Sequence, residues 1–401
     1  MAKCSQPERP AASDVDPFSN EFLTDPFPFL EELRELGSVV YLARYGVWAV
    51  ARHEQVVAVL RDHDTYSSAS GAGLTNLKAK SSWRKPSILL ETDPPVHTVN
   101  RRIVARVLSP RSLRSLQGTF ARRAEELVAR LAVRGTFDAV ADLAEIFPTE
   151  VFPDAFGLRD DGKEMLQAYA AMVFNGMGPP NELFDQAMAT GGDVIAWITE
   201  QCTRSSLRPD GLGAQIYAAV DAGEVTEEDA ALLIRSFLSA GIDTTVNAIA
   251  LGVLDFVRFP DQWKILRADR SLAGKAFDEV VRLECPVIGF FRTTTRSTSI
   301  GGTELPGDAK ILAFFAGANR DPRRWESPDR FDIRRDASGH LGYGTGAHSC
   351  AGQTIARMEG EALFRALAAK VESWGLAGQP RPRLRNALRG LDTLPVEVQV
   401  A

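Results

Sequence analysis

The sequence predicts a mainly α protein with small β sheets. Apolar residues recur every three or four positions through most of the first two-thirds of the chain, and this is the period of an amphipathic helix. The last third instead contains short runs of β-branched and aromatic residues between glycine and proline, a pattern typical of strands. The chain has 401 residues, of which 45% are hydrophobic and 24% charged, so it can bury a large core.

No Gly/Ser-rich or Pro-rich linker interrupts the sequence, so we expect one domain over residues 1–401, with residues 1–16 as a polar, flexible N-terminal tail. We see no apolar run typical of a signal peptide or of a membrane span of about 18 uncharged residues. The formal charge of −6 comes without a long basic block, which argues against nucleic-acid binding. The four cysteines form no C-x-x-C pair, which argues against a disulfide framework. We therefore expect a soluble, cytoplasmic monomer.

Each expected element follows from its local pattern. Helices are expected over residues 29–34, 54–61, 99–132, 160–175, 183–202, 226–259 and 363–371. Strands are expected over residues 39–42 and 47–50, which should form a hairpin, and over residues 293–300, 310–315 and 394–400. Residues 66–82 are small and contain glycine, so they are expected to form a loop.

The helix over residues 226–259 is the longest one expected. Thr226 and Asp229 have the spacing of a capping box, and Pro260 ends the pattern. Its length would be about 50 Å. Apolar residues leave it little polar surface, so it should run through the protein interior. Polar residues in its middle therefore require a functional or structural explanation.

A glycine-rich loop over residues 343–352 precedes a helical run that begins at residue 353, so Cys350 lies at a helix N-terminus. Exposed amides and the helix dipole favour a thiolate there. Gly344 lets the backbone approach a flat ligand, and the ring of Tyr343 can pack near the sulfur. One alternative is a buried cysteine that only caps the helix. Another is a zinc site with His348, although the other histidines have no metal-ligand spacing.

The order of these residues, an aromatic, a glycine and a cysteine followed two places later by glycine, resembles the haem-binding loop of cytochromes P450. The resemblance implies the P450 fold, with a long central helix over haem b. It also implies that Cys350 is the axial ligand of the iron, whose thiolate pushes electron density to favour O–O cleavage. Tyr343 stands where the family usually has phenylalanine, which leaves a hydroxyl in need of a partner.

The pair Glu279 and Arg282 resembles the Glu-x-x-Arg pair of the family, which supports the haem side of the fold. The resemblance implies a third charged member from a later segment. Arg330 is the expected member, and Arg334 is the alternative.

Four residues are implied to contact the haem propionates. His97 and Arg101 are four residues apart at the start of a helix, so both can point at one anion. In the family these positions bind the propionates, and Arg292 and His348 match the other contacts. Each residue alone also fits an ordinary surface or satisfied polar role.

Residues 240–245 interrupt the apolar helix and resemble the oxygen-binding groove of the family, with Ala240 facing the cofactor. Cleavage of an O–O bond toward water consumes two protons, which an alcohol fed by an acid can supply. The resemblance makes Thr244 and Asp243 the catalytic pair. The structural alternatives are a Thr244 hydroxyl bonded to the preceding turn and an Asp243 carboxylate in a buried ion pair.

Helix geometry places Ala240 on the face of Thr244 and Ser236 near its edge, while Arg235 points away. Ser236 is displaced from Thr244 by about 12 Å along the helix, enough to bind the far end of a small aromatic substrate. Arg84 and Ser87 bring further donors suited to a carboxylate.

These segments resemble bacterial P450s that oxidise para-substituted benzoates such as 4-methoxybenzoate, and the similarity covers nearly the whole chain. The resemblance implies that Arg84, Ser87 and Ser236 anchor the carboxylate, with Arg235 behind them. Residues that clamp the ring would be Leu90, Phe174, Met177, Val287 and Phe290. Met177 replaces an aromatic and Ile288-Gly289 replaces bulkier polar residues, so ring fit can differ. The alternative is a solvated Arg84 and a Ser236 that only packs.

The implied reaction hydroxylates or O-demethylates a small aromatic carboxylate with dioxygen and two electrons. The sequence contains no G-x-G-x-x-G turn for a nucleotide, so the electrons are expected from separate proteins. By resemblance these are a 2Fe-2S ferredoxin and its FAD-containing, NADH-dependent reductase. Alternatives are a peroxide-driven thiolate-haem enzyme, a haem-based sensor or carrier, and a haem-free helical scaffold.

Overall fold

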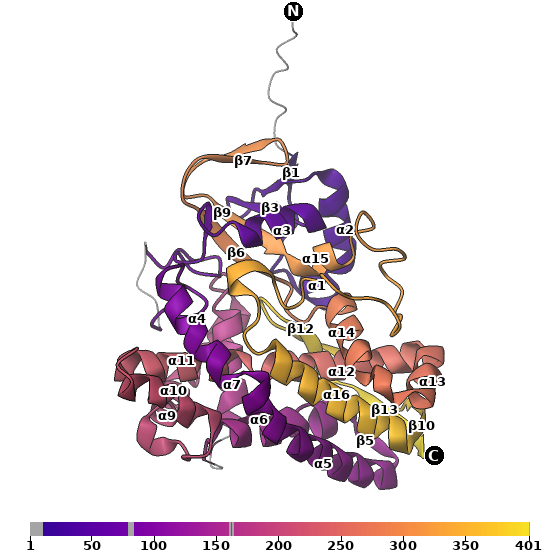
Figure 1. The fold of residues 1–401 in the computed structure, drawn as a ribbon. Coiled ribbons are helices and arrows are strands. Elements are labelled where there is room, and N and C mark those ends of the chain that lie inside the picture. The colour runs from indigo at the N-terminus through magenta and orange to yellow at the C-terminus, as the bar shows by residue number, and fades with distance from the viewer. Residues whose placement is uncertain (1–10, 79–83, 160–161, 163, 401) are drawn as a thin grey trace, which may run out of the picture.

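The computed structural model describes residues 11–78, 84–159, 162 and 164–400. The strands within residues 11–67 and 289–314 gather at one end of the molecule, and most helices form the other end, together with the strands at residues 136–138, 371–376 and 395–400 (Figure 1). This arrangement confirms the mainly α class with small sheets.

The largest sheet has six strands in the order β1-β2-β3-β9-β6-β4. The predicted hairpin is confirmed, because β2 and β3 pair antiparallel with Val40 opposite Ala49. Ala11 pairs in parallel with Val40, so part of the expected flexible tail is instead a strand. The strands of this sheet are β1 (Ala11–Ser13), β2 (Val40–Leu42), β3 (Val47–Val50), β4 (Tyr66–Ser67), β6 (Gly289–Thr294) and β9 (Lys310–Phe314).

Three smaller sheets complete the β structure of the described residues. They are β10 (Val371–Leu376), β13 (Pro395–Val400) and β5 (Thr136–Asp138); β11 (Arg381–Leu384) and β12 (Arg389–Thr393); and β7 (Thr298–Ile300) and β8 (Thr303–Leu305). The predicted run over residues 293–300 is therefore two strands, with a bend between them.

Most expected helices are present, but several boundaries were wrong. The run over residues 99–132 is two helices, because Ser109 caps a new helix whose first residue, Pro110, has no N–H to donate. The run over residues 183–202 is also two helices, and the helix expected at residue 363 begins at Gln353. The α-helices are α1 (Asn20–Thr24), α2 (Phe27–Leu36), α3 (His53–Arg61), α4 (Val96–Val107), α5 (Pro110–Arg134), α6 (Ile146–Phe156), α7 (Glu164–Asn175), α8 (Glu182–Met188), α9 (Gly191–Gln201), α10 (Leu212–Asp221), α11 (Glu227–Ala240), α12 (Asp243–Arg258), α13 (Pro260–Ala268), α14 (Ala273–Leu283), α15 (Phe315–Asn319) and α16 (Gln353–Lys370).

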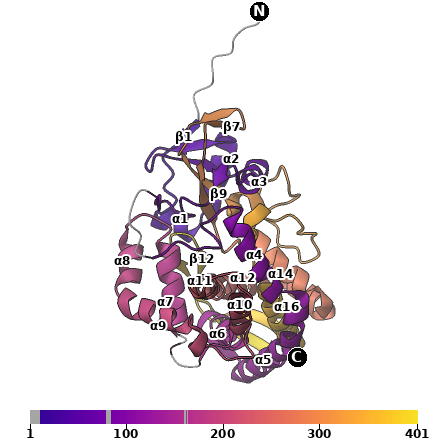
Figure 2. The same ribbon diagram turned by 60° about the vertical axis from the view of Figure 1, so that its left-hand side comes forward.

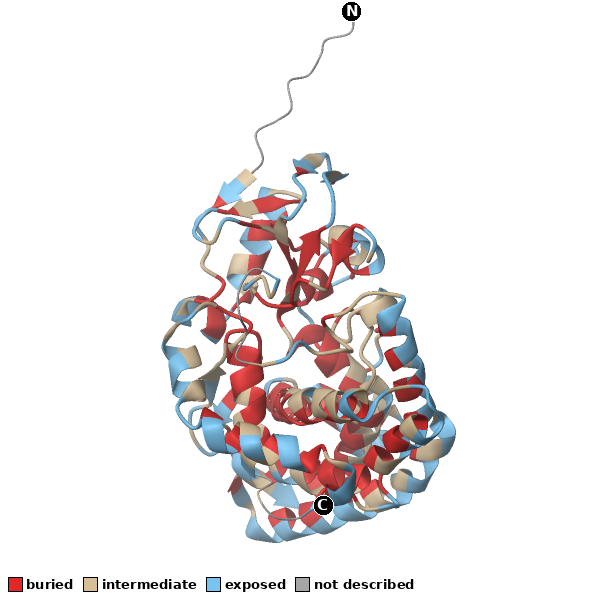
Figure 3. Cartoon of the chain, turned by 90° about the vertical axis from the view of Figure 1, so that its left-hand side faces the viewer, coloured by how far each residue is buried: buried red, intermediate tan, exposed pale blue. Residues whose placement is uncertain are grey.

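The central helix is α11 followed by α12, with an interruption at Gly241 and Ile242. It begins with the predicted capping box of Thr226 and Asp229. Figure 2 shows this helix between α7, α8 and α9 on one side and α4, α14 and α16 on the other, and Figure 3 shows buried residues along the middle of the fold. Residues 227–258 are long and apolar enough to cross a membrane, but 78% of their most apolar window is buried within the fold, as in the core helix of a soluble protein.

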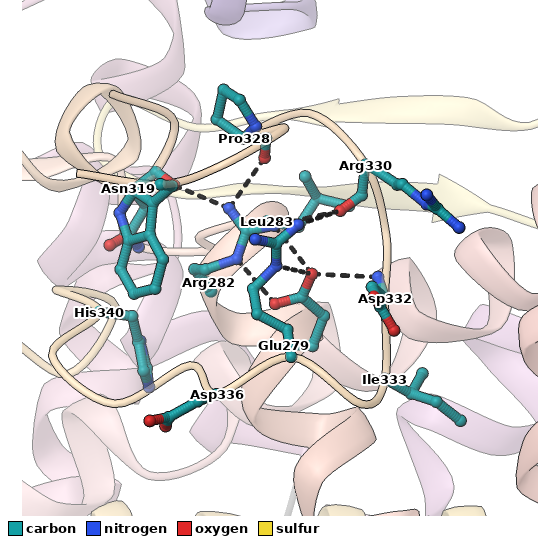
Figure 4. A network of polar contacts seen from close by, with 12 residues as sticks. Glu279, Arg282, Leu283, Asn319, Pro328, Arg330, Asp332, Ile333, Asp336 and His340 are labelled. Atoms are coloured by element: carbon teal, nitrogen blue, oxygen red, sulfur yellow. Dashed lines mark hydrogen bonds and ion pairs between the residues drawn. The ribbon is translucent and has the colours of Figure 1, made fainter. Parts of the chain in front are cut away.

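Glu279 and Arg282 form the predicted pair on α14, and both side chains are fully buried. Arg282 donates to both Glu279 oxygens at 2.7 and 2.8 Å and to the carbonyls of Asn319 and Pro328 (Figure 4). Every charge in this pair therefore has a partner, which burial of a charge requires.

The third charged member is Arg335, so our expectation of Arg330 or Arg334 was wrong. Arg335 Nε donates to Glu279 Oε1 at 3.0 Å, whereas Arg330 contributes only its carbonyl oxygen. A tight turn explains the difference. The Arg335 amide donates to the carbonyl of Asp332, and this turn directs the Arg335 side chain toward Glu279.

Replacing Glu279 with glutamine should destabilise the protein by about 3–5 kcal/mol, because Arg282 would remain buried without its counter-charge. The change in the free energy of unfolding can be measured by urea denaturation. The control is Glu361→Gln, which breaks an exposed pair with Arg365 and should change stability by less than about 1 kcal/mol. Equal effects of the two substitutions would contradict this account of the network.

Candidate active site

A cavity of about 240 Å³ with mainly apolar walls lies between the central helix and the loop that precedes α16. Nearly all the predicted site residues line it, although they come from segments far apart in the sequence. The predicted residues in the lining are Arg84, Ser87, Leu90, Arg101, Phe174, Met177, Arg235, Ser236, Ala240, Thr244, Val287, Phe290, Arg292, Tyr343, Gly344, His348 and Cys350. His97 and Asp243 do not line the cavity. His97 packs against His348, which does line it, and Asp243 pairs with Arg385, which does not.

Cys350 faces the cavity just before the first turn of α16. Its backbone N–H donates to the Tyr343 carbonyl at 2.7 Å, which folds the loop back on itself. Gly344 and Gly346 have φ of 64° and 75°, a conformation that glycine adopts without strain. The Tyr343 hydroxyl is buried and has no hydrogen-bond partner among the described residues, while the Arg357 guanidinium lies 4.8 Å above its ring.

The acidity of Cys350 differs from what the sequence suggested. Burial raises the pKa of its thiol, although the amides of Gly352 and Gln353 and the nearby guanidiniums of Arg101 and Arg357 act in the opposite direction. Helix amides alone are thus insufficient to ionise this sulfur. A coordinating metal ion deprotonates a thiol outright, so a bound iron would favour the thiolate here.

Several buried donors beside Cys350 have few or no partners among the described residues. His97 Nε2 has no hydrogen-bond partner there, and its ring centroid lies 4.3 Å from that of His348, whose Nε2 is 3.6 Å from Asp93 Oδ1. Arg292 is 3% exposed and donates only to the carbonyl of its neighbour Phe291 within the described chain, and burial lowers its pKa to about 10. Arg101 reaches Ser349 at 3.3 Å. Unpaired buried donors are costly, so this cluster fits a ligand with two carboxylates.

The interruption of the central helix lies against the cavity. Thr244 Oγ1 donates to the Ala240 carbonyl at 2.8 Å. This is the hydrogen bond to the preceding turn that was given as the alternative to a catalytic role. The donation leaves its lone pairs available as acceptors on the cavity side. Gly241 is required here, because a Cβ at this position would lie 2.3 Å from the ring of Phe152.

Asp243 is fully buried, and its Oδ2 lies 3.4 Å from Nε of Arg385. Burial raises the pKa of Asp243 while Arg385 and Arg383 lower it, and the net shift is upward. Its carboxylate oxygens accept no hydrogen bond from the described residues. The buried ion pair expected as the alternative to catalysis is therefore present, and it holds the acid next to the groove rather than in the cavity.

The hydroxyls of Ser87 and Ser236 meet at 3.1 Å on the cavity wall, as expected for a shared ligand site. Ser236 also donates to the Leu232 carbonyl, so it can accept one further hydrogen. Arg235 donates to the carbonyls of Lys85 and Pro86 at 2.8 and 3.2 Å. It therefore holds the loop that carries Ser87, and it also lines the cavity, although the helix geometry had placed it pointing away from the face of Thr244.

Arg84 is paired within the chain. It binds both carboxylate oxygens of Glu91 at 2.6 and 2.9 Å, and Glu91 is buried. Glu91 was not among the residues expected at the site, although its position four residues after Ser87 on a helical turn was a usable signal. Tyr169, which lines the cavity five residues before Phe174 on α7, was not expected there either.

A half-buried cysteine that faces a cavity, next to buried cationic donors for two carboxylates, fits a haem-thiolate site. The chain matches the family model described as Cytochrome P450 over residues 177–368. It is 50% identical to "Cytochrome p450 CYP199A2" of Rhodopseudomonas palustris over 96% of this chain and 94% of that protein. It is 28% identical to "Steroid C26-monooxygenase" of Rhodococcus jostii over 89% of this chain and 76% of that protein.

The solved structure of cytochrome P450 CYP109Q5 from Chondromyces apiculatus has a TM-score of 0.82 to this chain, with 28% identity and coverage of 98% of this chain and 99% of that one. The chain therefore belongs to the cytochrome P450 family, whose members are haem b monooxygenases. The described residues fit the haem: Cys350 would hold the iron, and the donors His97, Arg101, Arg292 and His348 would hold the propionates.

Replacing Arg292 with methionine should speed haem loss by about tenfold or more, because a hydrogen bond to a charged group contributes about 1.5–3 kcal/mol. Transfer of haem to apomyoglobin measures this rate. The apoprotein should not lose stability, since the buried guanidinium lacks a counter-ion within the described residues. The control is Arg102→Met, which removes an exposed arginine from the same region. Equal haem loss from the two variants would contradict the assignment.

Proposed function

We propose that this P450 hydroxylates or O-demethylates a para-substituted benzoate, with 4-methoxybenzoate as the reference substrate. The observation that carries the proposal is the hydroxyl pair of Ser87 and Ser236 beside Arg84, at the wall of a mainly apolar cavity. A ring anchored there by its carboxylate would extend toward Thr244, about 12 Å along the helix. The sequence resemblance to benzoate-oxidising P450s supports the same substrate class.

The proposed reaction inserts one oxygen atom of O₂ into a C–H bond and reduces the other to water, with two electrons and two protons. Hydroxylation of a methoxy methyl group gives a hemiacetal, which releases formaldehyde and leaves a phenol. When bound, the haem supplies the iron centre at which O₂ is activated.

The apolar residues Leu90, Phe174, Met177, Val287 and Phe290 would hold the ring and exclude water from it. Thr244 would use the free lone pairs of its hydroxyl to hold a proton donor in the groove. Asp243 would deliver protons from the side of Arg385 when their ion pair opens. The raised pKa of Asp243, caused by its burial, suits this role because it favours the protonated form that can donate a proton.

Bacterial P450s generally receive electrons from a ferredoxin and its reductase. For this chain we propose a 2Fe-2S ferredoxin and an FAD-containing, NADH-dependent reductase, acting on a cytoplasmic monomer. Turnover with NADH and these partners would support dioxygen activation. Turnover only with hydrogen peroxide would instead favour a peroxide-driven enzyme, and a protein whose spin state ignores all benzoates would fit a haem sensor or carrier.

Replacing Thr244 with alanine should reduce the product formed per NADH by about tenfold or more and increase release of hydrogen peroxide. The reason is that a positioned proton donor contributes about 10²–10⁴-fold to such steps. Product, NADH and peroxide are measured in the same reaction. The control is Thr199→Ala, which removes a similar hydroxyl bond to the preceding turn of a distant helix. Unchanged coupling in the Thr244 variant would refute the assigned role.

Replacing Ser236 with alanine should weaken binding of 4-methoxybenzoate by roughly tenfold or more, because a hydrogen bond to a charged group contributes about 1.5–3 kcal/mol. Binding of 4-methoxybenzyl alcohol, which has no charge, should change far less. Both affinities follow from the spin-state absorbance change. Leu90→Ala serves as the control, since loss of an apolar contact should weaken both ligands alike. A Ser236 variant that treats the two ligands equally would rule out carboxylate anchoring there.

A further inference from the structure

The segment from Ser70 to Leu74 connects several parts of the substrate site through its backbone. Its Ala72 carbonyl accepts from the Phe291 amide on β6 at 2.9 Å. The Leu74 amide donates to the carbonyl of Met177, one of the proposed ring clamps, at 2.8 Å. Gly73 lies so close to Met177 that a Cβ there would be 2.7 Å from its Cα. Displacing this segment would therefore displace Met177.

The six-stranded sheet contributes one lysine side chain that binds this segment. Lys310, the first residue of β9, donates from Nζ to the carbonyls of Ser70, Gly71 and Gly73 at 3.2, 2.8 and 2.8 Å. An ammonium group has three hydrogens, so these contacts use all of its donors. Lys310 does not line the cavity, and none of the proposed catalytic or binding residues contacts it directly by a hydrogen bond in the described chain.

The same segment reaches the proposed carboxylate anchor. The Glu91 carboxylate accepts from the amides of Ser87 and Ala72 as well as from Arg84, and together they lower its pKa. Arg84 and Glu91 carry opposite charges that cancel, so the pair alone offers a substrate carboxylate no net attraction. Arg235 also lines the cavity but is bonded to the carbonyls of Lys85 and Pro86, so a further positive charge on this side would strengthen the attraction.

We propose that Lys310 is a positioning residue for substrate binding: its ammonium fixes residues 70–74 and supplies the charge that offsets Glu91, which lets Arg84 attract a substrate carboxylate. The inference rests on the proposed function, because it concerns the affinity for a carboxylate ligand. Lys310 lies outside the cavity wall, and its charge would affect binding of the carboxylate end of the substrate only.

The charge of Lys310 is sensitive to pH. Burial and the neighbouring Arg292 lower its pKa to about 8, while Glu91 acts to raise it. Below this pH the ammonium is charged, and the charge is lost as the pH rises through about 8. A benzoate stays ionised throughout, since carboxylic acids titrate near pH 4. Affinity for the carboxylate should therefore fall above pH 8, whereas affinity for an uncharged analogue should not.

The test is a set of spin-state titrations of the holoenzyme between pH 7 and about 9.5, with 4-methoxybenzoate and with 4-methoxybenzyl alcohol. For the natural protein we expect affinity for the benzoate to fall by about tenfold across this range, with little change for the alcohol. Lys310→Gln keeps polar hydrogens for the carbonyls but has no charge. It should bind benzoate at pH 7 about as weakly as the natural protein does at pH 9.5, with no further dependence on pH.

Lys264→Gln is the control, because Lys264 is an exposed residue of α13 and should leave every titration unchanged. A benzoate affinity that is constant with pH in the natural protein would overturn the proposal without any variant. A Lys310→Gln enzyme that weakens both ligands equally would also overturn it, since Lys310 would then only support the loop. Absence of any response to benzoate in the natural protein would instead refute the proposed function.

Discussion

The cofactor site depends on the ionisation of one sulfur that faces the cavity. Cys350 lies where burial raises the pKa of its thiol, and the amides and guanidiniums around it only partly offset that effect. The fold thus prepares a site in which the thiolate and a metal cation stabilise each other, and neither is favourable alone. The loop geometry around Tyr343 and Gly344 serves this purpose by aiming the sulfur at the cavity.

Two groups of buried charges around this site illustrate opposite physical solutions. Glu279, Arg282 and Arg335 satisfy one another within the chain, so that part of the fold is complete without any ligand. His97 and Arg292 are buried without such partners among the described residues, and a bound carboxylate would offset the cost of burying them. The first arrangement gives rigidity behind the cavity, and the second would give affinity for the haem.

Local signals predicted much of the fold and of the cofactor site. The hairpin of β2 and β3, the capping box at Thr226 and the helix after Cys350 each follow from residues within a few positions of one another. Pro110 also indicates the start of a helix, but the apolar period continues on both sides of it, so one helix was expected where there are two. The cavity-lining residues were found because their motifs are short and specific.

Pairings over long sequence distances were not predictable. Asp243 pairs with Arg385 and Glu279 with Arg335, and nothing in either segment encodes which arginine will arrive. The same limit applied to Lys310, whose three carbonyl partners lie about 240 positions earlier in the chain. Such partners depend on how sheets and loops assemble, which sequence periodicity does not reveal.

If Arg84 is the proposed carboxylate anchor, its pairing with Glu91 would order that anchor before a ligand arrives. A free arginine would lose side-chain entropy on binding a carboxylate, whereas Arg84 is already fixed by two hydrogen bonds to Glu91. The disadvantage is that Glu91 repels the incoming carboxylate. Neutral donors such as the Ser87 and Ser236 hydroxyls do not bring that repulsion, and they confine the ligand to one orientation. Combining a fixed cation with neutral donors would therefore give the proposed selectivity for a planar aromatic acid without leaving an unpaired charge in an apolar cavity.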